Sequence, residues 1–350
     1  MDFINKIDHI PKYDFNDVMM IPYEPTHISS RKEVELTEHY KFENLIELHC
    51  VPIVASNMDR IGTIKMYKEL SKYNIITCFT KQITLDELVN TDVVLDPNLY
   101  ILSSGVSDSD MEELENKICS LNPRMVCFDV ANGYMINFIK KIKLFRERHP
   151  YITIIAGNIV TSSILYKLKD AGVDIVKVGI GSGSVCTTRL KTGVGYPQFS
   201  AILDMKTKAQ ELNMRIMSDG GIKYPGDVAK AFGAGASFVM IGGMFAGHNE
   251  CINNSELMNQ TNSINNEIKF YGNSSNEALY KHYGGTKKYR TTEGKSVTIK
   301  CKGPISNTLE DLLGGLRSSC AYLNCKNLSQ LFIKSKFIVV RQQVNNMFNK

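Results

Sequence analysis

The residues best suited to chemistry lie on a loop around Cys186. Residues 179–198 read GIGSGSVCTTRLKTGVGYPQ, so this cysteine stands among five glycines, with hydroxyl and basic side chains directly after it. Glycine allows a backbone to approach a ligand closely. A cysteine near cations and backbone N–H groups can ionise and act as a nucleophile. A buried cysteine on a plain linker is the alternative, but the flanking pattern favours a reactive thiol.

Three further groups would serve such a thiol. Thr188, two residues after the cysteine, offers a hydroxyl that can relay a proton, and Glu293 in YRTTEGK offers a carboxylate, although a loop glutamate is usually just solvated. SDGG at 218–221 and GG at 242–243 follow apolar runs and predict a phosphate site made of backbone N–H groups. The negatively charged Asp219 cannot bind phosphate, so we expect it to accept a hydrogen bond from a sugar hydroxyl or else to cap a helix.

Composition describes a water-soluble globular chain. The 350 residues are 43% hydrophobic, with a net charge of +5 that is dispersed, and no apolar run is long enough to span a membrane. The N-terminus carries charges where a signal peptide needs an apolar core. The nine cysteines are scattered without zinc spacing, which favours reduced thiols in the cytoplasm. We therefore expect neither nucleic acid nor membrane as a partner, and a phosphate-bearing small ligand is compatible.

The elements that must position these groups follow a regular rhythm. Eight short apolar runs begin near residues 51, 75, 100, 125, 152, 175, 215 and 238, and helix-patterned segments separate them, one predicted to begin at Asp227 and end at Gly235. This predicts a single α/β domain, a (β/α)8 TIM barrel, whose chemistry lies on the loops after the strands. A doubly wound open sheet is the alternative, but no GxGxxG follows the first run. Residues 1–50 form an N-terminal arm, and 248–303, an insertion after strand 8, is predicted to be a flap over the barrel mouth.

Ordered motifs along nearly the whole chain resemble the IMP dehydrogenase and GMP reductase family. They run from DFNDV (14–18) through SSRKEVEL, SNMD, DVANGY, AGN, the cysteine loop, SDGGI, FVMIGGMFAGH and YRTTEGK to GGLRSSCAY. CTTRLKTGVGYPQ is closer to the reductases of that family. The resemblance implies NADPH-dependent, irreversible reductive deamination of GMP to IMP and ammonia, in purine nucleotide interconversion and salvage. Cys186 would attack carbon 2 of the guanine and form a covalent thioimidate, with Thr188 and Glu293 handling protons.

The resemblance also implies the remaining site residues and a homotetramer in which the NADPH site is shared between subunits. The nucleotide would contact Asp219, Gly220, Gly221, Gly242, Gly243, Gly272, Asn273, Ser274, Arg290, Thr291, Thr292, Glu293 and Gly294. The cofactor would contact Lys81, Asp129, Val130, Ala131, Ile180, Gly181, Tyr289 and Arg290 and, on a neighbouring subunit, Ser30, Arg31, Ser318, Ser319, Cys320 and Ala321. Carbonyl oxygens of Gly181, Gly183, Cys186 and Arg189 would hold a potassium ion.

Two positions depart from the family pattern, and three alternative functions remain open. Ser182 replaces a usual proline, which predicts a looser loop, and Asn273 replaces a usual methionine. An IMP dehydrogenase would usually carry a regulatory (CBS) insertion after the second strand and an Arg-Tyr flap, and neither is found in this sequence. A catalytically silent nucleotide sensor would not need Cys186, and neither would a flavin-dependent barrel oxidoreductase.

Overall fold

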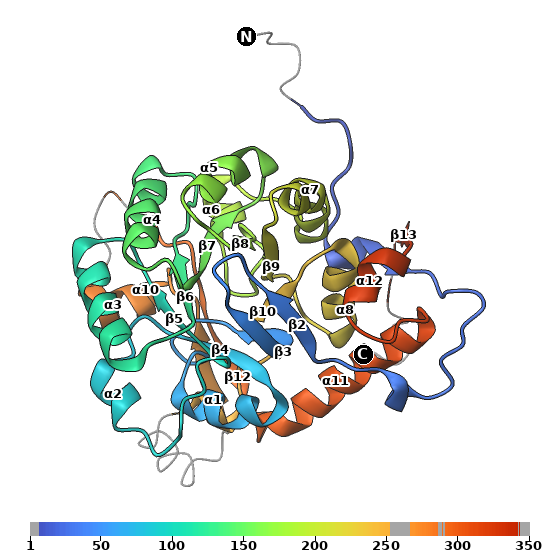
Figure 1. The fold of residues 1–350 in the computed structure, drawn as a ribbon, viewed down its shortest axis with the longest axis horizontal. Helices are drawn as coiled ribbons and strands as arrows, with labels where there is room; N and C mark the ends of the chain where they lie inside the picture. Colours follow the sequence, from blue (N-terminus) through green and yellow to red (C-terminus); the bar gives the residue numbers. More distant parts are fainter. Residues whose placement is uncertain (1–6, 253–266, 286–288, 290, 342, 344–350) are drawn as a thin grey trace.

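The structure is a computed structural model that describes residues 7–252, 267–285, 289, 291–341 and 343. At its centre, parallel strands form a closed barrel surrounded by helices (Figure 1). The closure is made by β10, which pairs with β9 on one side and with β3 on the other. The barrel strands are β3 (Glu47–Ala55), β4 (Ile75–Phe79), β5 (Tyr100–Ser104), β6 (Met125–Asp129), β7 (Thr153–Ile159), β8 (Ile175–Val178), β9 (Arg215–Asp219) and β10 (Phe238–Ile241).

The predicted barrel is confirmed, and its strands coincide with the eight apolar runs. Nearly every residue of these strands is buried, because one face packs inside the barrel and the other packs under the helices. Only residues 80–99 separate β4 from β5, so no additional domain interrupts the barrel at that point.

Helices of varied length cover the barrel. They are α1 (Ile64–Leu70), α2 (Leu85–Val89), α3 (Asp108–Leu121), α4 (Ile136–Arg148), α5 (Leu165–Asp170), α7 (Gln198–Glu211), α8 (Pro225–Ala234), α11 (Ile305–Tyr322) and α12 (Ser329–Lys334). The short helix α6 (Thr188–Thr192) belongs to the cysteine loop and buries none of its residues. The predicted stop at Gly235 is confirmed, since this residue ends α8 at φ 110°. The predicted start was wrong: α8 begins at Pro225, whose fixed φ suits a first helical position, and Asp227 lies inside the first turn.

A strand of the N-terminal arm pairs with a strand of the C-terminal region on one side of the barrel. In the N-terminal arm, β1 (Val18–Met20) pairs antiparallel with β13 (Phe337–Val339) near the C-terminus. The arm also supplies β2 (Glu38–Lys41), which extends β3 as an antiparallel hairpin, and a short 3-10 helix at Arg31–Glu33 that packs against α11. The arm is therefore tied to the last segments of the chain.

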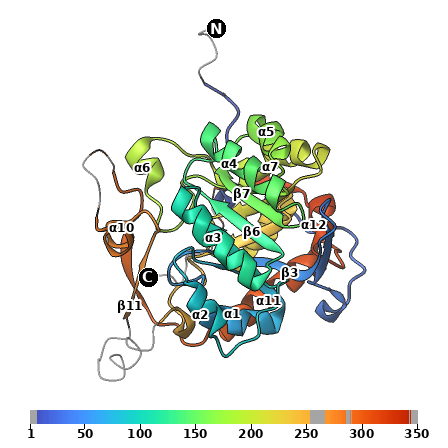
Figure 2. The same cartoon turned by 60° about the vertical axis from the view of Figure 1, so that its left-hand side comes forward.

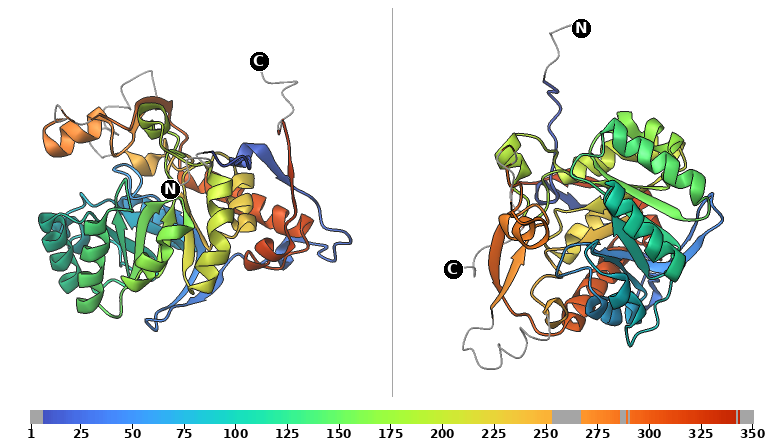
Figure 3. Two further views of the ribbon diagram at one scale, coloured as in Figure 1. Left: turned by 90° about the horizontal axis from the view of Figure 1, so that it is seen from above. Right: turned by 90° about the vertical axis from the view of Figure 1, so that its left-hand side faces the viewer.

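The segment at 248–303, called the flap here, forms a small unit beside the barrel. Its described elements are β11 (Glu267–Tyr271), α10 (Asn276–Tyr283) and β12 (Ser296–Lys300), and the two strands pair antiparallel. Its ends lie together, since the Lys302 N–H donates to the Gly247 carbonyl at 2.8 Å. Figures 2 and 3 show the flap next to α6, on the side of the cysteine loop. None of the helices within the described ranges has both the length and the apolar character needed to cross a membrane.

Candidate active site

Cys186, Thr188 and Glu293 form a chain of hydrogen bonds at the barrel mouth. The loop after β8 carries the cysteine, whose Sγ donates to Thr188 Oγ1 at 3.3 Å. Thr188 Oγ1 in turn donates to Glu293 Oε2 at 2.7 Å. The structure thus brings the three predicted catalytic side chains together, although 105 positions separate Thr188 from Glu293 in the sequence.

Backbone hydrogen bonds hold the glutamate in this place. The Thr187 N–H donates to the Glu293 carbonyl at 2.8 Å, and the Lys295 N–H donates to the Val185 carbonyl at 2.9 Å. Between them, Cys186 and Gly294 form an isolated antiparallel bridge. The flap and the cysteine loop are therefore joined by a single antiparallel bridge, and the position of the Glu293 carboxylate depends on how the flap docks.

The two predicted phosphate-binding turns pack directly against the cysteine loop. Gly220 has φ 93°, and a Cβ at that position would lie 2.5 Å from Ser182 Oγ. A Cβ at Gly243 would lie 2.5 Å from Ser184 Oγ. Gly220 is required because its φ is positive and the Gly183 backbone nitrogen is close, whereas a Cβ at Gly243 would need the Ser184 side chain to move. The turns after β9 and β10 therefore lie against the cysteine loop.

Asp219 does not cap a helix. It ends β9, while the next helix, α8, begins several residues later at Pro225. Its Oδ2 atom accepts from Lys177 Nζ at 2.7 Å and from Asn158 Nδ2 at 2.9 Å. The carboxylate is thus held at the mouth, where a polar ligand group can reach it.

Lys177 is a site residue that the sequence analysis missed. It lies on β8 with its side chain 3% exposed and also contacts Asp129 Oδ1 at 2.7 Å. Burial lowers the pKa of its ammonium, but Asp129 and Asp219 outweigh that effect, so the pKa is raised and the group stays charged. Burial likewise raises the pKa of Asp129, but Lys177 outweighs it and the net shift is downward. A lysine inside the apolar run IVKVG was the signal that could have found it.

The predicted cofactor residues fall into two groups. Lys81 lies near Asp129 at the mouth and pairs with Asp110 at 3.4 Å, where its ammonium also lies 5.4 Å from the Tyr283 ring centroid of the flap. Burial lowers the pKa of Lys81, but Tyr283 and Asp110 outweigh that effect and the pKa is raised. Val130, Ala131, Ile180 and Gly181 follow the ends of β6 and β8.

The second group lies on the arm and on α11. Ser30 caps the 3-10 helix that begins at Arg31, while Ser318 and Ser319 donate to carbonyls of their own helix at 2.9 and 3.1 Å. The Cys320 side chain is fully buried, so Cys320 could offer a ligand only its backbone. Tyr289 is 82% exposed. Arg290 lies outside the described residues.

The predicted cation ligands belong to one compact loop that the N-terminal arm anchors. A Cβ at Gly181 would lie 2.4 Å from Arg189 Cγ, and the Gly183 carbonyl accepts from the Cys186 N–H at 3.0 Å. Arg189 pairs with Asp14 of the arm at 2.9 Å, and Asp14 Oδ1 also accepts from the Gln198 N–H at 2.6 Å. Potassium binding by these carbonyl oxygens stays a prediction. Asp14 is a second residue next to the candidate site that the sequence analysis did not predict.

The structure gives each departure from the family pattern a contact. Ser182 Oγ donates to the Asp219 carbonyl at 3.1 Å, so the loop has a hydrogen bond that proline could not make. Asn273 Nδ2 lies 3.5 Å from the Asn57 carbonyl across the boundary between flap and barrel.

One largely buried carboxylate of the barrel accepts three hydrogen bonds from the flap. Asp59, on the loop after β3, is 7% exposed, and its Oδ2 accepts from Tyr271 Oη at 2.7 Å, Lys281 Nζ at 3.1 Å and His282 Nε2 at 2.7 Å. All three donors belong to β11 or α10. Burial raises the pKa of Asp59, but the hydrogen bonds from His282, Tyr271 and Lys281 outweigh it and lower the pKa. We call these four residues the flap clamp.

Most other thiols are unsuited to nucleophilic chemistry. All nine cysteines are free. Burial raises the pKa of Cys50 and Cys320 to about 12, and that of Cys251 and Cys325 to about 11. These thiols remain protonated at neutral pH, whereas Cys186 is partly exposed and bonded to a hydroxyl.

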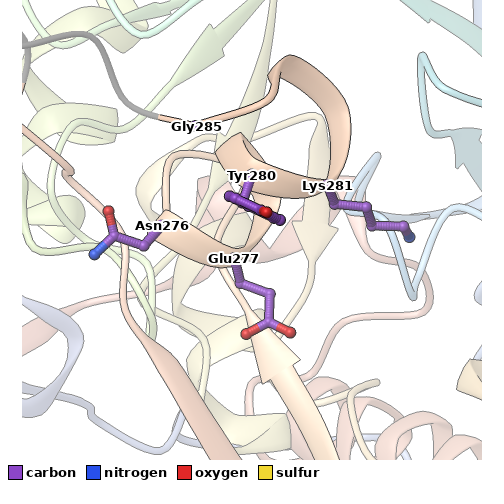
Figure 4. A pocket seen from close by; sticks show the side chains of 5 residues that line it. All are labelled: Asn276, Glu277, Tyr280, Lys281 and Gly285. Atoms are coloured by element: carbon purple, nitrogen blue, oxygen red, sulfur yellow. The ribbon is translucent and has the colours of Figure 1, made fainter.

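A hollow of about 700 Å³ lies along α10 of the flap (Figure 4). Its lining is Asn276, Glu277, Tyr280, Lys281 and Gly285. It contains none of the predicted catalytic or substrate residues. The glycine turns and the Cys186 chain instead place the candidate site at the carboxyl ends of the strands, where barrel enzymes carry out their chemistry.

Fold and site together define an α/β-barrel protein with a thiol, a hydroxyl and a carboxylate in series at its mouth. A sequence model described as the IMP dehydrogenase / GMP reductase domain matches residues 12–346. A Caenorhabditis elegans protein named GMP reductase is 46% identical over 349 residues, covering 98% of this chain and 96% of its own. Human GMP reductase 2 and a Klebsiella pneumoniae GMP reductase are each 44% identical, covering 98% of this chain and 99% of theirs. The chain belongs to the IMP dehydrogenase / GMP reductase family.

Proposed function

We propose that this protein is a GMP reductase that converts GMP to IMP and ammonia at the expense of NADPH, in purine nucleotide interconversion and salvage. The observation that carries the proposal is the hydrogen-bonded chain from Cys186 through Thr188 to Glu293. The names of the relatives, which match almost end to end, supply the substrate.

The chain of hydrogen bonds suits the first step. The Cys186 S–H gives its proton to Thr188 Oγ1, while Thr188 passes its own proton to the Glu293 carboxylate, and a thiolate is left. That thiolate forms a bond to carbon 2 of the guanine. The bond to the amino group breaks after this group takes the proton from Glu293, and ammonia leaves. The product is a thioimidate on Cys186, in which no atom has yet been reduced.

Reduction then releases the nucleotide. When bound, NADPH would supply the hydride that carbon 2 needs as its bond to sulfur breaks. Lys81 and Asp129 at the mouth would orient the nicotinamide end, and Ile180 and Gly181 would border it. Asp219 would accept a hydrogen bond from the sugar, and backbone N–H groups of the turns at 220–221 and 242–243 would hold the phosphate. Residues 272–274 and 290–294 of the flap would cover the nucleotide.

Three finer properties belong to the same proposal. Carbonyl oxygens of the loop at 181–189 would hold a potassium ion, whose charge would fix the loop. The arm group at 30–31 and the α11 group at 318–321 would contact the cofactor bound to a neighbouring subunit of a homotetramer. Free thiols suit the cytoplasm.

The test is absorbance at 340 nm with NADPH and GMP, beside a run with NAD⁺ and IMP. We expect absorbance to fall with GMP, and the loss to vanish in Cys186→Ala. A gain with NAD⁺ and IMP alone would make the protein a dehydrogenase. Nucleotide binding without turnover in either run would favour a sensor, and a yellow purified protein would point to flavin.

A further inference from the structure

Lys177 links two carboxylates that the proposed function gives to two different ligands. Its ammonium lies 2.7 Å from Asp129 Oδ1 and 2.7 Å from Asp219 Oδ2. Asp129 ends β6 and Asp219 ends β9, so the lysine on β8 reaches across the barrel interior between them. With 3% of its side chain exposed, Lys177 is screened very little by water.

An amide group supports each carboxylate from a further strand end. Asn57 Nδ2 donates to Asp129 Oδ2 at 2.8 Å, and Asn158 Nδ2 donates to Asp219 Oδ2 at 2.9 Å. Both oxygens of Asp129 are therefore engaged. Among the described residues none donates a hydrogen bond to Asp219 Oδ1, so one acceptor remains for a ligand hydroxyl.

The charges make this arrangement depend on the lysine. One ammonium stands between two partly buried carboxylates, so removing it leaves two negative groups whose remaining hydrogen-bond donors are neutral amides, with Lys81 farther from Asp129. Each carboxylate would then turn toward water or bind a proton, because an unpaired buried charge is costly. The ammonium is the only cation within salt-bridge distance of either carboxylate in the described part of the chain.

We propose that Lys177 is a positioning residue that fixes the nucleotide-sugar subsite at Asp219 and the nicotinamide subsite at Asp129 in one geometry. The inference rests on the proposed function. Because the two carboxylates share one partner, disturbing either subsite disturbs the other, and binding of the two ligands is coupled. Lys177 contacts neither the reacting atoms nor the thiol, so it acts only through the two aspartates.

The experiment compares Lys177→Met and Lys177→Arg with the wild type. For each protein, calorimetry gives the Kd of GMP and of NADPH separately, and steady-state assays give both KM values and kcat. We expect Lys177→Met to weaken both ligands by about tenfold or more, which is what loss of a charged hydrogen bond costs. Lys177→Arg, which keeps the charge, should recover part of both affinities.

A double variant separates positioning from simple stability. In Lys177→Met with Asp129→Asn, the repulsion between the carboxylates is gone, so GMP affinity should recover relative to Lys177→Met alone. Arg146→Met is the matched control, since it removes a half-buried cation from Asp174 at the opposite end of β8. This control should lower the melting temperature and leave both Kd values within about twofold.

Two results would overturn the inference: one ligand weakened without the other, or no recovery of GMP binding in the double variant. If the wild type binds both ligands without turnover, the proposed function fails. The two Kd values then still decide whether Lys177 positions both subsites.

Discussion

The flap clamp predicts that Asp59→Asn uncouples the flap from the barrel without unfolding the barrel. Asparagine keeps the size of the side chain and one acceptor oxygen but loses the charge that attracts Lys281 and His282. A hydrogen bond to a charged group contributes about 1.5 to 3 kcal/mol. Lys281 is 53% exposed, which reduces its share. We therefore expect flap docking to lose about 2 to 4 kcal/mol, or roughly 30- to 700-fold in its equilibrium constant.

The consequence for catalysis follows from the position of Glu293. Because the flap carries this carboxylate to Thr188, an undocked flap breaks the proton path. We expect kcat to fall by up to the same factor. The fall is smaller if docking of the wild-type flap is so favourable that the flap of the variant still stays mostly docked. Hydrogen exchange at 267–300 should accelerate, while exchange in the barrel strands should not change. Glu277→Gln is the control, because it breaks the Lys269–Glu277 pair within the flap but no contact to the barrel.

The pH dependence of docking has a definite sign. The pKa of Asp59 in the folded protein lies below its ordinary value of 3.8, so the clamp is fully formed above that pH. Its contribution is lost as pH falls through the lower, folded-state pKa. Protection of the wild-type flap amides, taken relative to their intrinsic exchange rate at each pH, should therefore stay constant between pH 7 and 5, and Asp59→Asn should lower that protection throughout. Unchanged kcat together with unchanged flap exchange in Asp59→Asn would refute the reasoning.

Three further changes test other contacts. Thr188→Val removes the relay hydroxyl and should lower kcat by about 10²- to 10⁴-fold with little change in the Kd of GMP. Thr188→Ser keeps a hydroxyl and should keep most of the activity, so an equal loss of kcat in both variants would exclude a proton relay. Gly220→Ala places a Cβ 2.5 Å from Ser182 Oγ on a residue with φ 93° and should weaken GMP binding by at least about tenfold. Gly226→Ala is the control in the same calorimetric titration, because a Cβ at that position meets no atom within 4 Å. Asp14→Asn should lower kcat/KM a few-fold, and more at low salt, because the ion pair with Arg189 is only partly buried. Asp8→Asn is the control and should leave kcat/KM unchanged. If Asp14→Asn has no effect at low salt, the arm does not support the active site.

The barrel could be predicted because its signal is local. A strand buried on both faces needs an almost unbroken apolar run, and each of the eight strands has one. The mouth could be predicted as well, since the topology gathers all loops after the strands on one face. The Cys186 loop carries its own glycines and hydroxyls, so its reactive character is visible in a single stretch of the sequence.

The partners of these residues could not be predicted in the same way. Lys177 is a single polar residue in an apolar run, and nothing near it in the sequence shows that two aspartates on other strands face it. Asp59 and His282 are 223 positions apart, and Asp14 and Arg189 are 175 apart. Such pairs depend on barrel closure and on the path of the arm, which a residue pattern does not encode.

The contact between Asp14 and Arg189 also affects the order in which the protein can assemble. The arm leaves the ribosome first, but its partners in the cysteine loop are synthesised much later, and β1 must wait for β13, near the end of the chain. Contacts of such large sequence separation form late, because a long loop must close before they can contribute. The nucleophile loop should thus acquire its final shape only in a finished chain, and a nascent or C-terminally truncated product would carry Cys186 without the support of the arm.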